Sequence, residues 1–436
     1  MNFTRSQLII LGSVGAVLLF IILLVTGIIP GLRNSFEKPP EITLTVWGIE
    51  DRAFFQENLV GYQTLRPNVQ VNYEELDADN YEGDLINALA SGKGPDIMMF
   101  HNSWLPKHFN KLVPVSDLQM KLKTLQEVFP TVIEQDFAPD GKIYALPLYI
   151  DTLALFYNQD IFDRNGVAVA PKDWLDFQNL IPKLRQKDAS SKITKAAAAI
   201  GGSEKSIDKA SDLLMLLMLQ AGTKMTDSEF SSATFGQNVA GLLPGLDAMN
   251  FYSKFTKADN TYYTWNDNFK YSLDAFSSGD SAMIFNYASS KTAIKNKNPF
   301  LNFKVSQMPQ PKSGEKAVNY ADYWGLSATN NSKSPDWAWD LILYLTANDT
   351  SAENYLKVSN RPPALRTLIQ KYSDHPELGV FAKQALTARS WPQIDKKSIS
   401  VIFSEMIQSV INGNLDAAAA ISQAERQVTE LMRARR

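Results

Sequence analysis

The chain has 436 residues, a hydrophobic fraction of 45%, a charged fraction of 20% and a formal net charge of −3. This length is sufficient for two hydrophobic cores, and the small net charge argues against a nucleic-acid partner. The absence of cysteine excludes disulfides, thiolate metal sites and a lipid-modified N-terminal cysteine.

The N-terminal region contains an uncharged run of 22 residues, 8–29, rich in Leu, Ile and Val. As a helix it would be about 33 Å long, enough to cross the hydrocarbon core of a bilayer. The apolar region of a cleavable signal is shorter, about 7–15 residues, and ends at small residues. We therefore predict an uncleaved signal-anchor transmembrane helix within residues 1–30, with a buried core helix as the alternative. Residues 31–40 are predicted to be a tether, because Pro39-Pro40 blocks helix continuation.

The next segment alternates between predicted strands and helices. Strands are predicted at 41–47, 69–73 and 97–100, and helices at 51–65 and 81–90, from alternating, continuous or helically spaced apolar residues. This order favours a parallel sheet with helices on both faces. Ligands of such sheets lie beyond the carboxyl ends of the strands, so Trp47 and the residues from His101 to Trp104 are predicted to share one edge.

The rest of the chain is compatible with a second lobe. An apolar helix is predicted at 211–219, and a helix, turn and strand start at 273–283. The C-terminal region, 400–432, is predicted to be helical, with a break at residues 412–414, Asn-Gly-Asn.

Several short segments occur in a fixed order along residues 41–436. They are Trp47 at the first strand end, GKGPDI at 92–97, GKIYALPLYIDTLALFYNQDIF at 141–162, PKDW at 171–174, FSSGDSAMIFN at 276–286, YWGLSA at 323–328 and NRPP at 360–363. Each segment is weak evidence alone. Together, in this order, they resemble the bacterial extracellular solute-binding proteins (family 1) of ABC importers, the group that includes maltose-binding protein.

The resemblance implies an α/β fold with two lobes, periplasmic-binding-protein-like of class II, after the N-terminal transmembrane helix. One lobe would hold residues 41–148 and 300–350, and the other residues 149–299 and 351–436. The chain would cross between lobes near residues 148–152, 299–303 and the 350s, giving a hinge.

The same resemblance implies a function. A small solute, expected to be a sugar or oligosaccharide, would be captured between the lobes and delivered to the permease subunits of an ABC transporter. The protein would be a single-pass cell-membrane protein, held through its N-terminal helix, with an extracytoplasmic binding domain. The alternative is a membrane-anchored ligand sensor or interaction protein that uses the same fold without transport.

Two features depart from the family pattern. Most relatives from bacteria without an outer membrane carry a lipidated cysteine, which the N-terminal helix would replace here. In maltose-binding protein a stacking tryptophan follows the asparagine that matches Asn286, whereas this chain continues Tyr287-Ala288-Ser289. Maltodextrin specificity is therefore not implied, although Tyr287 would supply another aromatic surface.

A sugar site needs flat aromatic faces for the C–H surfaces of the ring, and polar side chains for the hydroxyl groups. The residues predicted to bind the solute are Trp47, His101, Asn102, Ser103, Tyr149, Asp151, Tyr287, Tyr323, Trp324, Arg361 and Trp391. Asp151 lies in an apolar run, where an unpaired carboxylate is costly, so it must bond a ligand or the scaffold. For the aromatic residues the alternative is packing in a core, for His101 a bonded loop position, and for Arg361 a surface salt bridge.

Enzymatic motifs do not occur in this sequence. It contains no HExxH, GxSxG, P-loop or GxGxxG pattern, and its three histidines, His101, His108 and His375, lack metal-ligand spacing. Residues 77–84 resemble a calcium loop only faintly, because Tyr81 occupies a ligand position and the glycine comes one place late. We therefore predict a binding protein without catalytic residues, bound metal or cofactor.

Overall fold

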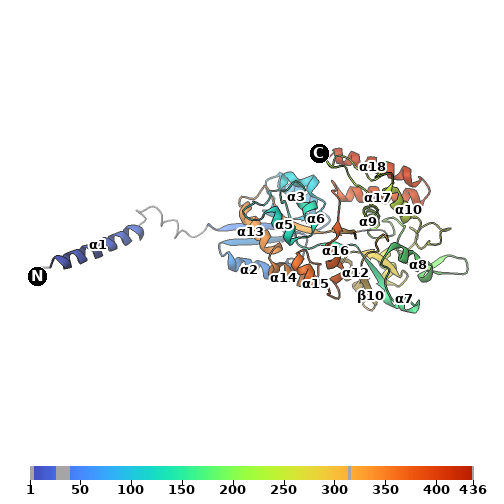
Figure 1. The fold of residues 1–436 in the computed structure, drawn as a ribbon, viewed down its shortest axis with the longest axis horizontal. Coiled ribbons are helices and arrows are strands. Elements are labelled where there is room, and N and C mark those ends of the chain that lie inside the picture. The colour runs from blue at the N-terminus through green and yellow to red at the C-terminus, as the bar shows by residue number, and fades with distance from the viewer. Residues whose placement is uncertain (1–3, 26–39, 313–315, 435–436) are drawn as a thin grey trace.

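The structure is a computed structural model that describes residues 4–25, 40–312 and 316–434. Helix α1 (Arg5–Val25) lies apart from the remaining chain, which forms two lobes side by side (Figure 1). Within the three described ranges, no helix is both long and apolar enough to cross a membrane. The transmembrane helix thus stays a prediction. Residues 26–29 of the uncharged run and residues 31–39 of the tether lie outside the described ranges.

The first lobe is built on a five-stranded mixed sheet with the order β2-β1-β3-β12-β4. Its strands are β1 (Ile42–Gly48), β2 (Val69–Glu75), β3 (Ile97–His101), β4 (Leu146–Pro147) and β12 (Trp324–Ala328). Strand β1 pairs in parallel with β2 and β3, as the sequence predicts, whereas β12 is antiparallel to β3 and β4. The helices and 3-10 turns of this lobe are η2 (Arg52–Phe54), α2 (Gln56–Leu65), α3 (Tyr81–Ala90), α4 (Leu105–His108), η3 (Phe109–Lys111), α5 (Leu122–Val128), α6 (Thr131–Phe137), α13 (Pro335–Thr346), α14 (Asp349–Ser359) and α15 (Arg366–Tyr372).

Two of the short segments that carry the family resemblance hold this sheet together. In GKGPDI, the carboxylate of Asp96 accepts hydrogen bonds from Thr45 N at 2.8 Å, Thr45 Oγ1 at 2.9 Å and Ser332 Oγ at 2.6 Å. These bonds fix the start of β3 beside β1. In YWGLSA, a Cβ on Gly325 would lie 2.3 Å from the backbone oxygen of Leu146, so β12 and β4 can approach closely only with glycine there.

The second lobe contains a three-stranded antiparallel sheet with the order β10-β6-β9. Its strands are β6 (Ala154–Asn158), β9 (Met283–Asn286) and β10 (Phe303–Ser306), and β7 (Gln186–Lys187) pairs separately with β8 (Ile193–Lys195). Asn158 ends β6 and caps the next helix, because its Oδ1 accepts from Ile161 N at 3.0 Å. The helices are α7 (Gln159–Arg164), α8 (Trp174–Leu184), α9 (Ala210–Gln220), α10 (Pro244–Ser253), α11 (Ser272–Ser277), α12 (Ser290–Lys297), α17 (Lys396–Ile411) and α18 (Ala417–Ala434). Helix α16 (Gly379–Ala385) lies at the junction of the lobes, where it contacts α15, β5 and β11.

Three short strands join the lobes: β5 (Asp151–Thr152), β11 (Asn319–Asp322) and β13 (Ala388–Arg389). They form one sheet with the order β13-β11-β5. Core membership changes at each strand: between Ile150 and Leu153, between Tyr320 and Ala321, and between Ala388 and Trp391. The crossing predicted at 148–152 therefore coincides with β5. The crossings predicted at 299–303 and in the 350s are wrong, since the chain crosses at β11 and β13 instead.

Two segments consequently belong to a different lobe from the one predicted. Strand β10, within residues 300–350, pairs with β6 from Phe303↔Asn158 to Ser306↔Leu155, so it completes the second lobe's sheet. Core residues between 352 and 369 pack in the first lobe, where α14 contacts α2 and α13. Pairing of β6 along both edges and burial of the apolar face of α14 decide these two placements.

Candidate functional site

A cavity of about 650 Å³ lies between the two lobes. The first lobe contributes Asn102, Leu105, Pro106, Lys107, Phe109, Asn110, Gln135, Asp136, Pro139, Asp140 and Tyr144 to its lining. The opposite wall consists of Glu229, Phe230, Pro392, Ile394 and Met432, from the second lobe and the segment after β13. The volume is in the range of sites that enclose small ligands.

Each lobe presents an exposed aromatic ring to this cavity. Phe109 on the first lobe is 56% exposed, and Phe230 on the second lobe is 39% exposed. Phe230 also has a φ of 54°, a left-handed backbone conformation that costs free energy for a residue other than glycine. A strained, exposed phenylalanine in a cavity wall is a candidate binding residue, and neither ring was predicted from the sequence.

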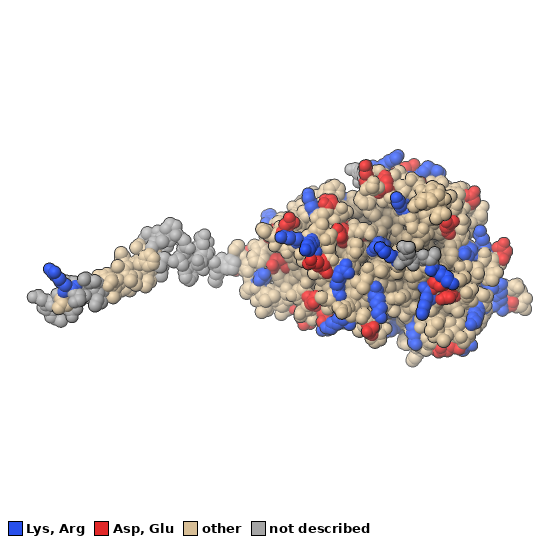
Figure 2. Space-filling model, viewed as in Figure 1, with Lys and Arg blue, Asp and Glu red and all other residues tan. Residues whose placement is uncertain are grey.

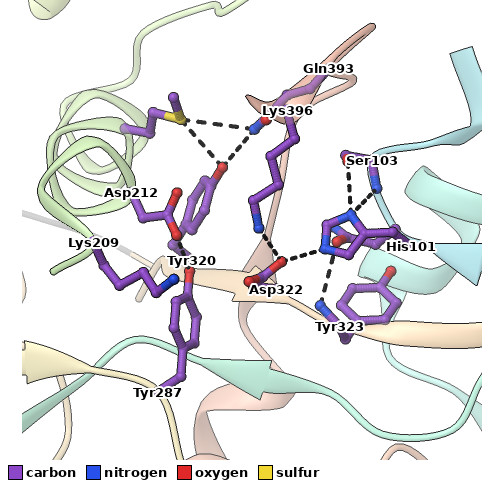
Figure 3. Close-up of polar contacts among 12 residues, drawn as sticks. His101, Ser103, Lys209, Asp212, Tyr287, Tyr320, Asp322, Tyr323, Gln393 and Lys396 are labelled. Carbon is purple, nitrogen blue, oxygen red and sulfur yellow. Dashed lines mark hydrogen bonds and ion pairs between the residues drawn. The ribbon is translucent and has the colours of Figure 1, made fainter. Parts of the chain in front are cut away.

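A polar network joins the lobes beside the cavity (Figure 3). His101, at the end of β3, lies with its Nε2 2.6 Å from Asp322 Oδ1, and Lys396 from the second lobe forms an ion pair with the same oxygen. The N–H of Ser103 donates to His101 Nδ1 at 3.2 Å. His101 Nδ1 is therefore an acceptor, which assigns the ring proton to Nε2 and makes Nε2 the donor to Asp322.

Electrostatics fix the charges of this network. Burial, and then Lys396, lower the pKa of His101, so its ring is neutral near pH 7. Burial alone would raise the pKa of Asp322, but Lys396 and His101 outweigh it and hold that pKa well below its usual range. Asp322 is thus an ionised carboxylate on β11, bound by a histidine of one lobe and a lysine of the other.

A second carboxylate, Asp136 on α6, lines the cavity itself. It accepts hydrogen bonds from Asn102 Nδ2 at 3.1 Å, from the Tyr323 hydroxyl at 2.7 Å and from the Ser390 hydroxyl. Burial raises the pKa of Asp136 to about 6, although these three bonds favour the ionised form. Gln135 Nε2 also donates to Ser390 O at 2.7 Å, so α6 holds the chain just after β13.

Aromatic residues surround His101 on the first lobe. The Trp324 ring lies with its centroid 5.0 Å from that of His101 and 5.0 Å from that of Trp104. Trp47, at the end of β1, is partly buried against the first core, and its carbonyl accepts from the Tyr81 hydroxyl at 3.0 Å. Trp324 therefore packs beside His101 and Trp104, while Trp47 packs on the sheet edge.

Arg361, Tyr149 and Asp151 lie close together near β5. The Arg361 guanidinium lies 4.8 Å from the centroid of the Tyr149 ring, and its Nη2 donates to Glu50 Oε1 at 2.7 Å. The Asp151 carboxylate accepts from the backbone N–H groups of Thr152, Ala288 and Ser289. Burial raises the pKa of Asp151 to about 6, and the backbone bond from Ala288 and the charge of Arg361 partly oppose this effect.

Tyr287 and Trp391 are buried in the second core, with 3% exposure each. The Tyr287 hydroxyl donates to Asp212 Oδ2 at 2.8 Å, and Trp391 Nε1 lies 3.3 Å from Met215 Sδ. Both partners are on α9, which begins just after Lys209, another residue with a left-handed φ, of 63°. These two aromatic residues shape the second-lobe side of the network.

The comparisons with known proteins agree with this architecture. A family model described as bacterial extracellular solute-binding protein matches residues 61–380, well over half of the chain. The chain belongs to the bacterial extracellular solute-binding proteins. The predicted family is therefore confirmed.

Individual relatives of this solute-binding protein are distant. The maltodextrin-binding protein MdxE of Bacillus subtilis (strain 168) is 25% identical over 382 residues, covering 84% of this chain and 78% of its own. A protein of Brucella abortus (strain 2308), named only as a binding protein, is 22% identical over 428 residues, with coverages of 93% and 98%. The solved structure of the sugar-binding protein MalE from Xanthomonas citri matches with a TM-score of 0.75 and 18% identity, over 90% of this chain and 98% of that chain. This likeness confirms the two-lobe α/β fold.

Of the residues predicted to bind solute, Asn102 is the one found among the described lining residues of the cavity. His101 and Ser103 flank Asn102, the Tyr323 N–H donates to Asn102 Oδ1 at 3.4 Å, and Trp324 pairs with His101 between β12 and β3. Sequence reasoning did not find the charged and aromatic residues that this solute-binding protein adds between its lobes. These are Phe109, Asp136, Lys209, Asp212, Phe230, Asp322 and Lys396. Asp322 directly precedes the segment YWGLSA, and Lys396 comes five residues after Trp391, a predicted binding residue. Proximity to such positions was the one available signal.

Proposed function

We propose that this solute-binding protein captures a carbohydrate in the cavity between its lobes and delivers it to an ABC transporter permease. The observation that supports the proposal best is the composition of the cavity wall. Phe109 and Phe230 offer aromatic faces from opposite lobes, and Asn102, Asn110 and Gln135 offer amide groups. Sugars need both kinds of contact, because their rings have apolar C–H faces and polar hydroxyl groups.

The names of relatives support the same ligand class. MdxE is named for maltodextrin, another relative from Bacillus subtilis is named for galactooligosaccharide, and MalE is named as sugar-binding. A cavity of about 650 Å³ is compatible with a short oligosaccharide. We further propose that Trp47, Tyr149, Asp151, Tyr287, Arg361 and Trp391 contribute indirectly, by shaping the cavity and the crossing strands.

Calorimetric titration with a panel of oligosaccharides tests this proposal. We expect binding by at least one of them, with the affinity weakened about tenfold or more in Phe230→Ala, because burial of a phenylalanine side chain contributes about 1.5–3 kcal/mol. Phe300→Ala is a matched control, since Phe300 is 94% exposed and does not line the cavity. An equal loss of affinity in Phe230→Ala and Phe300→Ala would overturn the proposal. Binding of no oligosaccharide by wild type would overturn it as well.

We also propose that the uncharged run at residues 8–29 anchors the protein in the cell membrane with its lobes outside the cytoplasm. Among the residues whose burial the structure describes, both cores consist of residues from Leu44 onward, so no described side chain of the run belongs to either. N-terminal sequencing of the membrane-extracted protein is expected to find the run retained. A mature terminus after residue 29 would refute the anchor.

Transport and sensing are distinguished by uptake of the bound sugar. Deletion of the gene is expected to abolish import of that sugar by intact cells. Normal import by the deletion strain, with binding by the purified protein established, would favour the alternative of a membrane-anchored sensor or interaction protein.

A further inference from the structure

Phe230 lies at the tip of a hairpin formed by residues 226–233 of the second lobe. The first and last residues of this hairpin pair as an isolated antiparallel bridge. The base of the hairpin is bound to α18, because the Ala233 N–H donates to Thr429 Oγ1 at 3.1 Å. Helix α18 also supplies Met432 to the cavity lining, so the hairpin and this helix together form part of the second-lobe wall.

A carboxylate within the hairpin fixes the residues that follow Phe230. Asp227 Oδ1 accepts a hydrogen bond from the Ser231 N–H at 2.7 Å. Asp227 Oδ2 accepts from the Ser231 hydroxyl and, at 2.6 Å, from the Ser232 hydroxyl. The bonds from Ser231 and Ser232 lower the pKa of Asp227 to about 2, so the carboxylate is ionised at neutral pH. Hydrogen bonds to an ionised acceptor are stronger than those between neutral groups.

These bonds explain how the hairpin keeps Phe230 in a strained conformation. The φ of 54° at Phe230 is unfavourable for a residue with a side chain and persists where surrounding interactions impose it. The Asp227 carboxylate holds the residues just after Phe230, and the Phe230 N–H donates to Asp227 O at 3.3 Å. Removal of the carboxylate would let the tip relax, and the direction of the Phe230 ring would change with its backbone.

A second turn of the chain has the same construction. Asp188 Oδ1 accepts from the Ser190 N–H at 2.9 Å and from the Ser190 hydroxyl at 2.6 Å. Ser191, the third residue after Asp188, has a φ of 64°, and its N–H donates to Asp188 O at 3.0 Å. Phe230 is likewise the third residue after Asp227. Because serine is sufficient at the left-handed position of this turn, the turn itself does not require a phenylalanine.

The two turns differ in what they face. Phe230 lines the cavity and is 39% exposed, whereas the turn of Asp188 contributes none of the described lining residues. A ring that is already fixed before the solute arrives loses little conformational freedom on binding, which favours affinity. The location of Phe230 and the rigidity of its turn therefore point to the same role.

We propose that Asp227 is a positioning residue for solute binding, which holds Phe230 as a fixed aromatic platform for a sugar ring. The inference rests on the proposed carbohydrate-binding function and adds to it a residue that acts through Phe230. The face of the phenyl ring packs against the apolar C–H face of a pyranose, so its orientation in the wall decides whether the two faces meet.

Calorimetry on the full chain, in a detergent without a sugar head group, tests the inference with maltotriose, cellotriose and β-1,4-galactotriose. For each probe that wild type binds, Asp227→Ala is expected to weaken the affinity about threefold to tenfold, because the ring must then be ordered on binding. Asp227→Asn keeps one oxygen for the Ser231 N–H and should weaken the affinity less. Asp188→Ala is the matched control, since it removes the corresponding bonds from the second turn and should leave the affinity unchanged.

A double-variant cycle separates positioning from a merely structural role. In the Phe230→Ala background, Asp227→Ala should have no further effect on the affinity, because no ring remains to be positioned. Equal affinities of wild type and Asp227→Ala, or additive effects of the two substitutions, would overturn the positioning role and leave the carbohydrate-binding function in place. Binding of none of the three probes by wild type would count against the proposed function and remove the inference with it.

Discussion

Substitution of Asp322 directly tests how much its ion pair with Lys396 contributes to holding the lobes together. Asp322→Asn keeps the side-chain shape and an oxygen that can accept from His101 Nε2. It removes the negative charge opposite Lys396, whose side chain is only 30% exposed. The perturbation therefore isolates the ion pair from the histidine bond.

The expected loss follows from burial and charge. A hydrogen bond to a charged group contributes about 1.5–3 kcal/mol, and removing one partner leaves the other incompletely solvated. The Asp322 side chain is 23% exposed, so water and screening reduce the effect. We expect the free energy of unfolding at pH 7 to fall by about 1–2 kcal/mol.

The pH dependence has a defined sign. The pKa of Asp322 in the folded chain lies well below the ordinary 3.8, so its stabilisation is complete above 3.8 and is lost only as the pH falls through the folded value. The difference between wild type and Asp322→Asn should therefore be constant from pH 7 to pH 5.

Urea unfolding of wild type, Asp322→Asn, Lys396→Met and the double variant measures the coupling. We expect a coupling energy of about 1 kcal/mol between Asp322 and Lys396. Asp322→Asn alone leaves the Lys396 ammonium group without its carboxylate, whereas the double variant removes that ammonium group as well. Asp340→Asn, which breaks the more exposed Arg66–Asp340 pair, is the matched control and should cost about 0.5 kcal/mol or less. Additive effects of the two single substitutions would refute the reasoning.

Three further predictions concern Asp136, Phe230 and lobe closure. The pKa of Asp136 is about 6 in the folded chain and 3.8 in the unfolded chain, so protonation of this carboxyl stabilises the fold as the pH falls. The free energy of unfolding of wild type minus that of Asp136→Asn should therefore be about 1 kcal/mol larger at pH 5 than at pH 7. An equal difference between the two proteins at pH 5 and pH 7, measured by urea unfolding, would contradict this prediction. Phe230→Gly should raise the melting temperature slightly, because glycine adopts the left-handed φ of residue 230 without its free-energy cost. The same substitution should weaken solute binding. A lower melting temperature would refute the strain argument. Small-angle scattering should show a smaller radius of gyration with bound solute, because only a closed form lets both walls contact it, and an unchanged radius at saturation would exclude closure.

Local sequence patterns predicted many elements of this fold. The helix predicted at 81–90 is α3 without change, and the predicted strand at 97–100 differs from β3 by one residue. The apolar helix at 211–219 is α9, one residue longer at each end, and the break at residues 412–414 separates α17 from α18. Apolar periodicity and breakers act over a few residues, so they are readable without knowledge of the distant chain.

The lobe boundaries needed information that short patterns do not carry. Strand β10 belongs to the second lobe because its hydrogen bonds go to β6, about 150 residues earlier, and α14 belongs to the first because it packs on α2 and α13. A four-residue strand has the same local pattern in either lobe. Pairing partners alone decide where it lies.

The sequence by itself determined the family, the order of elements in the first sheet, and the His101-Asn102-Ser103 group at a strand end. Only the tertiary structure brought Asp322 and Lys396 to His101, across 221 residues in the first case, and placed Phe109 opposite Phe230. It also showed that Asp151, Tyr287 and Trp391 are buried and bonded to the scaffold. The reason is physical: the charge, burial and backbone strain of a site residue depend on atoms supplied by distant segments, whereas helix and strand formation depend mainly on near neighbours.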